Sequence, residues 1–122
     1  MTNEIITKRN FDLEERTSKF AKNCIDICKG LVKDTINKEL ISQLIRAAGS
    51  VGANYREAND SLSRKDFYHR IGICRKEAKE SRYWLGLLLH ANVQHPIDLN
   101  EQMDEALQLT RIFASIIKTK DK

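Results

Sequence analysis

The sequence predicts an all-α protein: an antiparallel, up-down-up-down four-helix bundle that forms one domain over residues 1–122. Three observations support this prediction. The chain holds five glycines and one proline, and these residues usually mark the turns between strands. Apolar residues recur at alternating spacings of three and four, the periodicity of a helix that buries one face. Hydrophobic residues make up 41% of the chain and charged residues 31%, a balance typical of a globular domain.

The first helix is predicted over residues 13–32. Asp12 is its expected N-cap, and Glu15, three residues later, would complete a capping box. The expected buried face consists of Leu13, Thr17, Phe20, Cys24, Ile27 and Leu31.

The second helix is predicted over residues 38–62, with Asn37 as its N-cap. Its apolar positions keep a strict 3–4 alternation, the spacing of a coiled-coil seam. They are Ile41, Leu44, Ala48, Val51, Tyr55, Ala58 and Leu62. Gly49 and Gly52 interrupt this helix, and each interior glycine costs about 0.5–1 kcal/mol relative to alanine. We therefore expect the small residues to let another helix, the third, approach closely.

The third helix is predicted over residues 64–91, with Ser63 as its N-cap and Asp66 three residues later. It repeats the same spacing as the second helix. Its expected buried positions are Phe67, Ile71, Cys74, Ala78, Ser81, Leu85 and Leu88.

The fourth helix is predicted over residues 99–118, where Asp98 and Glu101 form another capping box. Its expected buried positions are Leu99, Met103, Ala106, Thr110, Phe113 and Ile117. Four helices of this length with short connections pack antiparallel to their neighbours.

Polar residues beside the seam of the second helix need partners, because a buried amide without one costs about 1–3 kcal/mol. We expect Arg46, Asn54, Glu57 and Glu77 to form an inter-helix polar network that fixes the register of the helices. The alternative is a polar pocket around Asn54 and Glu57 that binds or turns over a ligand.

The sequence offers no positive sign of an enzyme. It contains no phosphate-binding Gly-x-x-x-x-Gly-Lys, no Gly-x-Ser-x-Gly and no His-Glu-x-x-His. A di-metal bundle site needs a Glu-x-x-His on each of two helices, whereas this chain has Asp66-x-x-His69 alone. Cys24 and Cys28 lie one turn apart and could bind a metal, but they fit better as small apolar filler. We expect no catalytic residue, no metal and no cofactor.

Basic residues are concentrated in the third helix. Residues 64–82 carry seven basic and three acidic side chains, a net charge of +4, which equals that of the whole chain. A basic stripe that includes an aromatic residue can bind a phosphate backbone and stack a base. The candidate nucleic-acid-binding residues on one face are Arg64, Tyr68, Arg75, Lys79 and Arg82. The alternative is a solvated face laced by local ion pairs.

Apolar residues outside the predicted core point to self-association. The segment YWLGLLL is apolar on every side of the third helix, and the fourth helix carries a spare apolar line. The candidate oligomer-interface residues are Tyr83, Trp84, Leu87, Leu109, Ile112 and Ile116. The alternative is that the N-terminal segment with Ile5, Ile6 and Phe11 covers them. No apolar run approaches the roughly 18 residues that span a bilayer, and the polar N-terminus lacks a secretory pattern, so we expect a cytoplasmic protein without a membrane partner.

Two stretches, QLIRAAGSVGANYREA and SRKDFYHRIGICRKEAKESRYWLGLLL, resemble the four-helix-bundle proteins encoded in intervening sequences of bacterial 23S ribosomal RNA genes, which are often labelled ribosomal by convention. The resemblance begins near Phe11 and runs through the third helix. The residues that carry it are Gln43, Arg46, Ser50, Asn54 and Glu57, then Phe67, Glu77, Ser81 and Leu85. It implies an antiparallel bundle and a ring-shaped homopentamer. A more distant resemblance is to the accessory variability proteins of diversity-generating retroelements, which are basic pentameric bundles that bind nucleic acid and a reverse transcriptase.

We therefore expect a non-enzymatic, oligomeric protein whose partners are further copies of itself and rRNA or another nucleic acid. The alternative is a structural or protein-interaction module that uses its apolar patch and does not bind nucleic acid.

Overall fold

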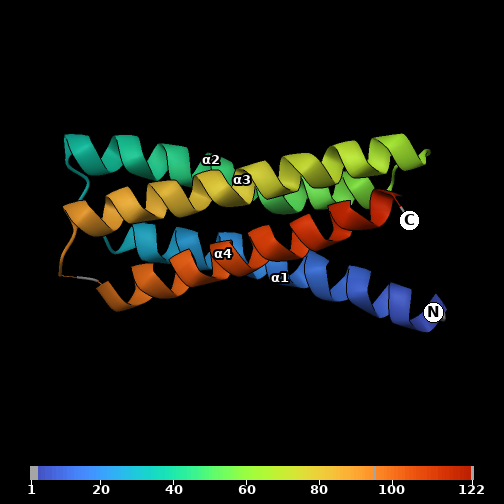
Figure 1. Cartoon of the computed structure of the whole chain (residues 1–122). Coiled ribbons are helices and arrows are strands. Elements are labelled where there is room, and N and C mark those ends of the chain that lie inside the picture. Colours follow the sequence, from blue (N-terminus) through green and yellow to red (C-terminus); the bar gives the residue numbers. More distant parts are fainter. Residues whose placement is uncertain (1–2, 95, 122) are drawn as a thin grey trace.

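The computed structural model describes residues 3–94 and 96–121, without the side chains of residues 3–12 and 96–97, and the described chain forms four long helices. They are α1 (Asn3–Lys29), α2 (Thr35–Asn59), α3 (Arg64–Ala91) and α4 (Pro96–Lys118), and a short 3₁₀ turn, η1 (Thr119–Asp121), follows α4. Successive helices run in opposite directions (Figure 1). The all-α bundle predicted from the sequence is therefore confirmed.

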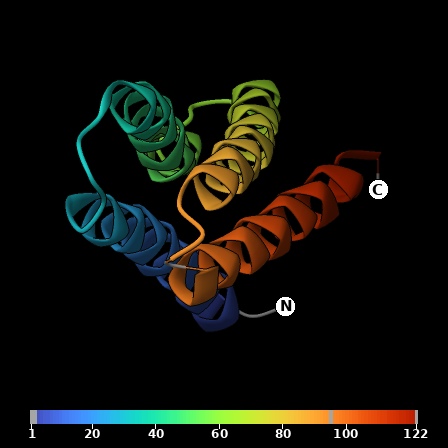
Figure 2. The ribbon, with the colours of Figure 1, turned by 90° about the vertical axis from the view of Figure 1, so that its left-hand side faces the viewer.

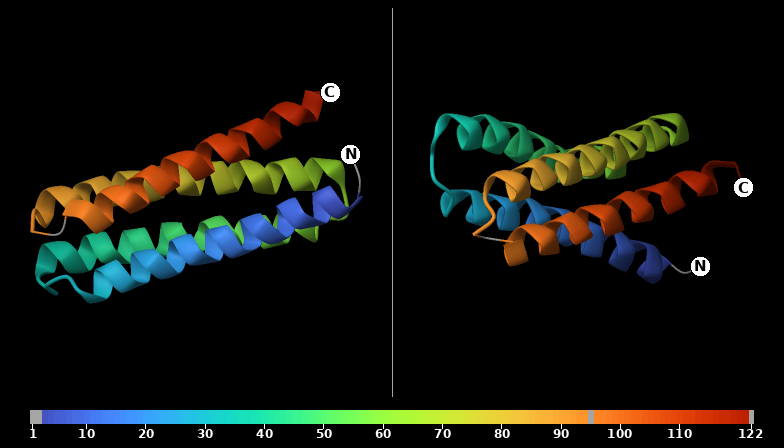
Figure 3. Two further views of the ribbon diagram at one scale, coloured as in Figure 1. Left: turned by 90° about the horizontal axis from the view of Figure 1, so that it is seen from below. Right: turned by 60° about the vertical axis from the view of Figure 1, so that its left-hand side comes forward.

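The four helices surround one core when the bundle is seen from its end (Figure 2). α2 and α3 stay side by side, whereas the C-terminal half of α4 and the N-terminal half of α1 diverge (Figure 3). The core contains the predicted seams of both central helices: Leu44, Ala48, Val51, Tyr55 and Ala58 from α2, and Ile71, Cys74, Ala78, Ser81, Leu85 and Leu88 from α3. Tyr55 packs against Phe113 of α4, with ring centroids 6.0 Å apart.

α1 and α4 begin earlier than the sequence predicted. α1 starts at Asn3, so Asp12 lies inside the helix and is not its N-cap. Residues 3–12 contain neither proline nor glycine, so nothing in that segment ends the helix. α4 starts at Pro96, which places Asp98 in its first turn rather than at its N-cap. Proline is favoured at the first helical position because its missing N–H is not needed there.

α2 begins and ends three residues earlier than the sequence predicted, because Asp34 rather than Asn37 is its N-cap. The Asp34 carboxylate accepts a hydrogen bond from the backbone N–H of Asn37 at 2.8 Å. α2 then ends at Asn59, so Leu62 lies in the following turn, fully exposed, and is not part of the seam. α3 has the predicted limits, and Ser63 is its N-cap, as expected: Ser63 Oγ accepts from the N–H of Asp66 at 3.1 Å.

A buried amide pair joins the two connections at one end of the bundle. Asn37 Nδ2 donates to Asn92 Oδ1 at 2.8 Å, and Asn92 Nδ2 donates to Asn37 Oδ1 at 2.9 Å. Asn37 Nδ2 also donates to the carbonyl of Val32. These bonds satisfy polar groups of the α1–α2 loop and of the end of α3, which explains why Asn37 is inside the protein rather than at the cap.

The glycines of α2 have different surroundings. A Cβ atom on Gly52 would lie 3.0 Å from Oγ1 and 3.3 Å from Cβ of Thr17, whereas a Cβ atom on Gly49 would meet nothing within 4 Å. Thr17 is fully buried, and its hydroxyl donates to the carbonyl of Leu13 at 2.7 Å. Gly52 therefore lets α1, and not α3 as expected, approach α2.

These two glycines form a matched pair for a stability test. Gly52→Ala should lower the free energy of unfolding by about 1–3 kcal/mol, because the hydrogen-bonded Thr17 has no room to move away. Gly49→Ala should raise it by about 0.5–1 kcal/mol, since alanine favours the helix and meets open space. Urea unfolding followed by circular dichroism measures both, and effects of the same sign would contradict this view of the α1–α2 contact.

Candidate nucleic-acid interface

A hollow of about 430 Å³ lies between α3 and α4. Its lining consists of Lys79, Arg82, Tyr83, Gly86 and Leu87 from α3 and Met103, Leu107 and Thr110 from α4. Most of this lining is apolar, and both lining cations come from α3. The Thr110 hydroxyl donates to the carbonyl of Ala106 at 2.8 Å, so the polar group on the α4 side is already used within its own helix.

Three of the five predicted phosphate contacts are exposed on α3, and two of them, Lys79 and Arg82, line this hollow. Arg75, Lys79 and Arg82 follow one another at spacings of four and three on α3, which places them along one line. The ion pairs among the described residues join Arg16 to Glu105 and Arg46 to both Glu77 and Glu80. The three cations are therefore not neutralised within the described part of the chain, and they are available to an external anion.

α4 adds cations to the same side that the sequence analysis missed. Arg111 is exposed and follows Leu107, a residue of the hollow, by four positions, and Lys118 is exposed seven positions further on. On a helix these spacings return to one side. The exposed acid near this line is Asp104, whose carboxylate accepts a hydrogen bond from Gln108 at 2.8 Å. Exposed cations therefore lie on the side of α4 that carries Leu107 as well as on α3, although the sequence analysis considered those of the third helix alone.

Arg64 and Tyr68, the other two predicted contacts, bind the C-terminal turn instead. The Arg64 guanidinium donates to the carbonyls of Thr119 and Lys120. The Tyr68 hydroxyl shares a 2.7 Å hydrogen bond with Thr119 Oγ1. Arg64 also lies over the Tyr68 ring, 5.3 Å from its centroid. A guanidinium favourably caps the carbonyl end of a helix, so these two residues hold the end of α4 against the start of α3.

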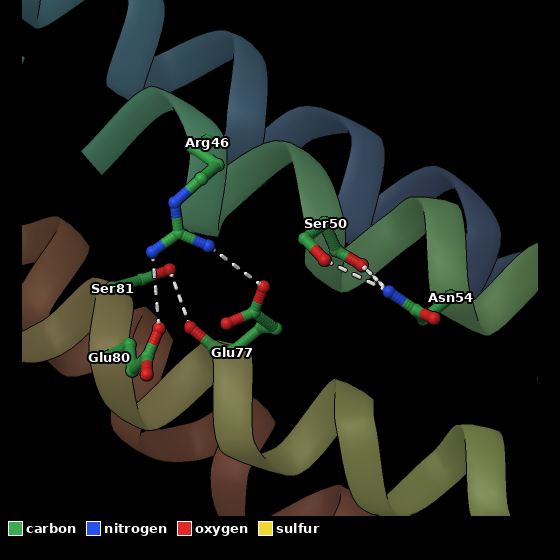
Figure 4. A network of polar contacts seen from close by, with 6 residues as sticks. All are labelled: Arg46, Ser50, Asn54, Glu77, Glu80 and Ser81. Carbon is green, nitrogen blue, oxygen red and sulfur yellow. Dashed lines mark hydrogen bonds and ion pairs between the residues drawn. The ribbon is translucent and has the colours of Figure 1, made fainter. Parts of the chain in front are cut away.

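The single polar network predicted for Arg46, Asn54, Glu57 and Glu77 is not formed; Arg46 and Glu77 belong to one polar cluster and Asn54 to another (Figure 4). In the first, Arg46 reaches Glu77 at 3.4 Å and Glu80 at 3.3 Å. The Glu77 side chain is 8% exposed, whereas that of Arg46 is 54% exposed. The neighbouring Glu77 side chain and then the contact with Arg46 lower the pKa of Glu80. A carboxylate whose pKa falls on folding stabilises the protein above its ordinary titration range, and that contribution is lost as the pH falls through the lowered pKa.

The second cluster lies two turns further along α2. It includes Arg70 of α3, a cation that the sequence analysis did not place in the network. Asn54 Nδ2 donates to the carbonyl and the hydroxyl of Ser50, both at 2.9 Å, and Asn54 Oδ1 accepts from Arg70 at 3.0 Å. Glu57 is exposed and belongs to neither cluster within the described residues. It borders a shallow polar hollow with Asp66, His69 and Arg70, among others. The amide of Asn54 is thus engaged inside the protein rather than directed at a pocket.

The predicted interface residues do not form a single surface. Tyr83, 61% exposed, and Leu87 line the α3–α4 hollow, while Trp84 is partly buried and packs against the core. Leu109 is fully buried in the core, so including it in an interface was wrong: its position on α4 faces the other helices.

Ile112 and Ile116 are partly buried. Ile116 follows Leu107 by nine residues, or two and a half turns, so it lies on the opposite side of α4 from the hollow. The alternative that Ile5, Ile6 and Phe11 cover these apolar residues concerns side chains that lie outside the described part of the structure.

The three cysteines are buried and unpaired. Burial raises the pKa of Cys24 to about 12, that of Cys28 to about 11 and that of Cys74 to about 12. The thiolate is the form that binds metals and attacks substrates, so these thiols behave as small apolar groups at neutral pH. Among the described residues, no group of three or more His, Cys, Asp or Glu is placed to hold a metal ion. In the same part of the chain, no helix combines the length and apolarity needed to cross a membrane.

Comparison with known proteins supports the resemblance found in the sequence. The family model described as 23S rRNA-intervening sequence protein matches residues 9–115. A 1.70 Å crystal structure of a protein of unknown function from the S23 ribosomal protein family of Bacteroides thetaiotaomicron VPI-5482 superimposes with a TM-score of 0.78 at 30% sequence identity. The match covers 86% of this chain and 97% of that chain. No curated protein gives a significant match.

The Arg46 cluster leads to a second stability test. Arg46→Met should lower the free energy of unfolding by about 1–3 kcal/mol, because it leaves the nearly buried Glu77 carboxylate without its cation. Adding Glu77→Gln should recover part of this loss, since the buried group is then neutral. Arg16→Met is the matched control. The Arg16–Glu105 pair is shorter, at 2.7 Å, but its side chains are 36% and 24% exposed, so its removal should cost less than about 1 kcal/mol. Equal losses for Arg46→Met and Arg16→Met in urea unfolding would refute the role given to burial.

Proposed function

We propose that this chain, which belongs to the 23S rRNA-intervening sequence protein family, is a cytoplasmic, non-enzymatic, oligomeric protein that binds RNA or another nucleic acid through the α3–α4 face. The observation that supports this proposal most directly is the row of exposed cations Arg75, Lys79 and Arg82, which have no ion-pair partner among the described residues. Lysine and arginine that neutralise phosphates release bound counterions, and this release drives binding without sequence specificity.

The α4 side strengthens the case for an extended anion. Arg111 and Lys118 are exposed on the side of α4 that carries Leu107, a residue of the hollow, so exposed cations lie on two helices rather than in a single cluster on α3. A small anion would need one or two of them, whereas a phosphate backbone presents charges at regular intervals. The family description links these proteins to 23S ribosomal RNA, which makes structured rRNA the first nucleic acid to test.

Self-association is the second part of the proposal, with five copies as the number implied by the resemblance to pentameric relatives. If nucleic acid occupies the α3–α4 hollow, the contact between copies lies elsewhere. Ile112 and Ile116 belong to the C-terminal half of α4 and lie on the side away from the hollow. That half of α4 diverges from α1 (Figure 2). Partly exposed isoleucines there are suited to an apolar contact with a second copy.

The alternative function is a protein-interaction module without nucleic acid. One observation favours it: the hollow has an apolar floor, and Tyr83 beside it is 61% exposed. Tyrosine is a frequent anchor of protein interfaces. In this alternative the hollow itself receives a second copy or another protein.

The salt dependence of binding tests the nucleic-acid function. Each phosphate contact that is removed should reduce the slope of log K against log salt concentration by about 0.7–0.9, so Lys79→Gln/Arg82→Gln should reduce it by about 1.4–1.8. Titration of labelled rRNA fragments at several salt concentrations measures the slope. Lys22→Gln/Arg56→Gln is the matched control, because it removes one lysine and one arginine from the α1–α2 side. The absence of binding by the unmodified protein even at low salt would exclude the proposed function.

Light scattering distinguishes the two candidate contacts between copies. Under the proposal, Ile112→Gln/Ile116→Gln lowers the mass of the particle and Leu87→Gln leaves it unchanged, because Leu87 lies in the nucleic-acid face. The reverse result would support the protein-interaction alternative. Circular dichroism of each variant shows whether it is folded, and Leu62→Gln, which changes a fully exposed leucine in a turn, serves as control.

A further inference from the structure

We propose that the α3–α4 hollow binds an unpaired nucleobase against Tyr83, so that the preferred ligand is single-stranded or bulged nucleic acid rather than a continuous duplex. This inference rests on the nucleic-acid function proposed above and specifies the substrate class of the same face. It replaces Tyr68, the residue expected from the sequence to stack a base, with Tyr83.

Tyr68 is less suited to stacking a base. Its hydroxyl is hydrogen-bonded to Thr119 Oγ1, and the Arg64 guanidinium lies over one face of its ring. A base stacked on that face would have to displace the guanidinium. Tyr83 is different, because 61% of its surface is exposed and it borders the hollow. Trp84 supports it from one side, with ring centroids 5.1 Å apart and an angle of 69° between the rings.

The floor of the hollow suits a flat, weakly polar group. It is formed by Gly86 and by the apolar side chains of Leu87, Met103 and Leu107. A Cβ atom on Gly86 would lie 3.5 Å from Met103 Cε, an ordinary contact, so packing inside the chain does not require glycine here. A glycine inside a helix costs about 0.5–1 kcal/mol relative to alanine. The missing side chain widens the hollow next to Tyr83, and a ligand that enters there accounts for it.

The cations define the chemistry of the ligand. Lys79 and Arg82 lie four residues and one residue before Tyr83 and line the same hollow. A base held against Tyr83 would therefore place its neighbouring phosphates beside an ammonium and a guanidinium group. Bases inside a duplex are paired and stacked on one another, whereas unpaired bases can turn outward and stack on an aromatic side chain. An apolar hollow with a tyrosine and two cations thus selects unpaired nucleotides, while a duplex would contact the cations alone.

The test compares labelled oligouridylate with the blunt oligouridylate–oligoadenylate duplex of the same length, at equal salt, by fluorescence anisotropy. The unmodified protein should bind the single strand more tightly. Tyr83→Leu, which keeps apolar bulk but removes the ring, should weaken single-strand binding roughly 5- to 150-fold and leave duplex binding unchanged. Tyr83→Phe should bind like the unmodified protein. Gly86→Ala, which narrows the hollow, should also weaken single-strand binding while its urea midpoint stays the same or rises.

Each other outcome has a defined meaning. Equal binding of single strand and duplex, or unchanged single-strand binding by Tyr83→Leu, would overturn the inference and leave the phosphate-binding function standing. No binding of either probe at low salt would remove the proposed function itself. A lower particle mass of Tyr83→Leu in light scattering, with unchanged affinity for oligouridylate, would assign the hollow to a second copy of the chain and overturn the inference.

Discussion

The close packing of α2 against α3 is the constraint on which the rest of the structure depends. Both helices repeat the 3–4 spacing over several turns, and their inward residues, from Leu44 to Ala58 and from Ile71 to Leu88, are completely or almost completely buried. The contact between α2 and α3 occupies the apolar face of each helix. The other sides of α3 therefore make different contacts. One side carries the Arg46–Glu77 and Asn54–Arg70 contacts to α2, and another borders α4 and the hollow. The two polar clusters oppose a slip of one helix along the other, because a slip of one turn would remove the partner of Glu77.

Several residues that carry the family resemblance have structural roles in this arrangement, whereas Glu57 is exposed and belongs to neither polar cluster. Arg46, Glu77, Ser50 and Asn54 all belong to the polar clusters (Figure 4), and Ser81 Oγ donates to the carbonyl of Glu77 at 2.8 Å inside the core. None of them lies in the α3–α4 hollow. The resemblance therefore accounts for the fold through the α2–α3 contact, whereas the proposed binding face consists of residues outside that set. This separation explains why a match over residues 9–115 specifies the bundle without specifying a ligand.

Features that follow from local periodicity were predictable from the sequence, and features that depend on contacts between distant segments were not. Apart from Leu62, which lies beyond the end of α2, the seams of α2 and α3 were correct because burial follows the helical period. The cap of α2 was wrong because Asn37 and Asp34 are both good capping residues, and Asn37 is used instead by Asn92, 55 positions away. Tyr68 was expected to stack a base because nothing in the sequence indicates that Thr119 reaches it. Arg111 was missed because a charge count along one helix does not show which second helix borders the same hollow. Leu109 was misplaced because two 3–4 lines share Leu99, Ala106 and Phe113. The line that continues through Leu109 is the buried one, whereas Met103 and Thr110 of the predicted line are only partly buried.

The two interactions proposed for this protein are not independent, because the hollow brings together residues that the sequence analysis assigned to different functions. Lys79 and Arg82 were candidates for phosphate contacts, and Tyr83 and Leu87 were candidates for a contact between copies, yet all four line one cavity of about 430 Å³. A second protein that covered Tyr83 and Leu87 would bury both cations, and burying unpaired charges is unfavourable unless the partner supplies acids. A nucleic-acid strand supplies those anions with every nucleotide and also provides a flat group for the apolar floor. Charge compensation therefore favours nucleic acid as the occupant of the hollow and leaves the Ile112–Ile116 side of α4 for contacts between copies.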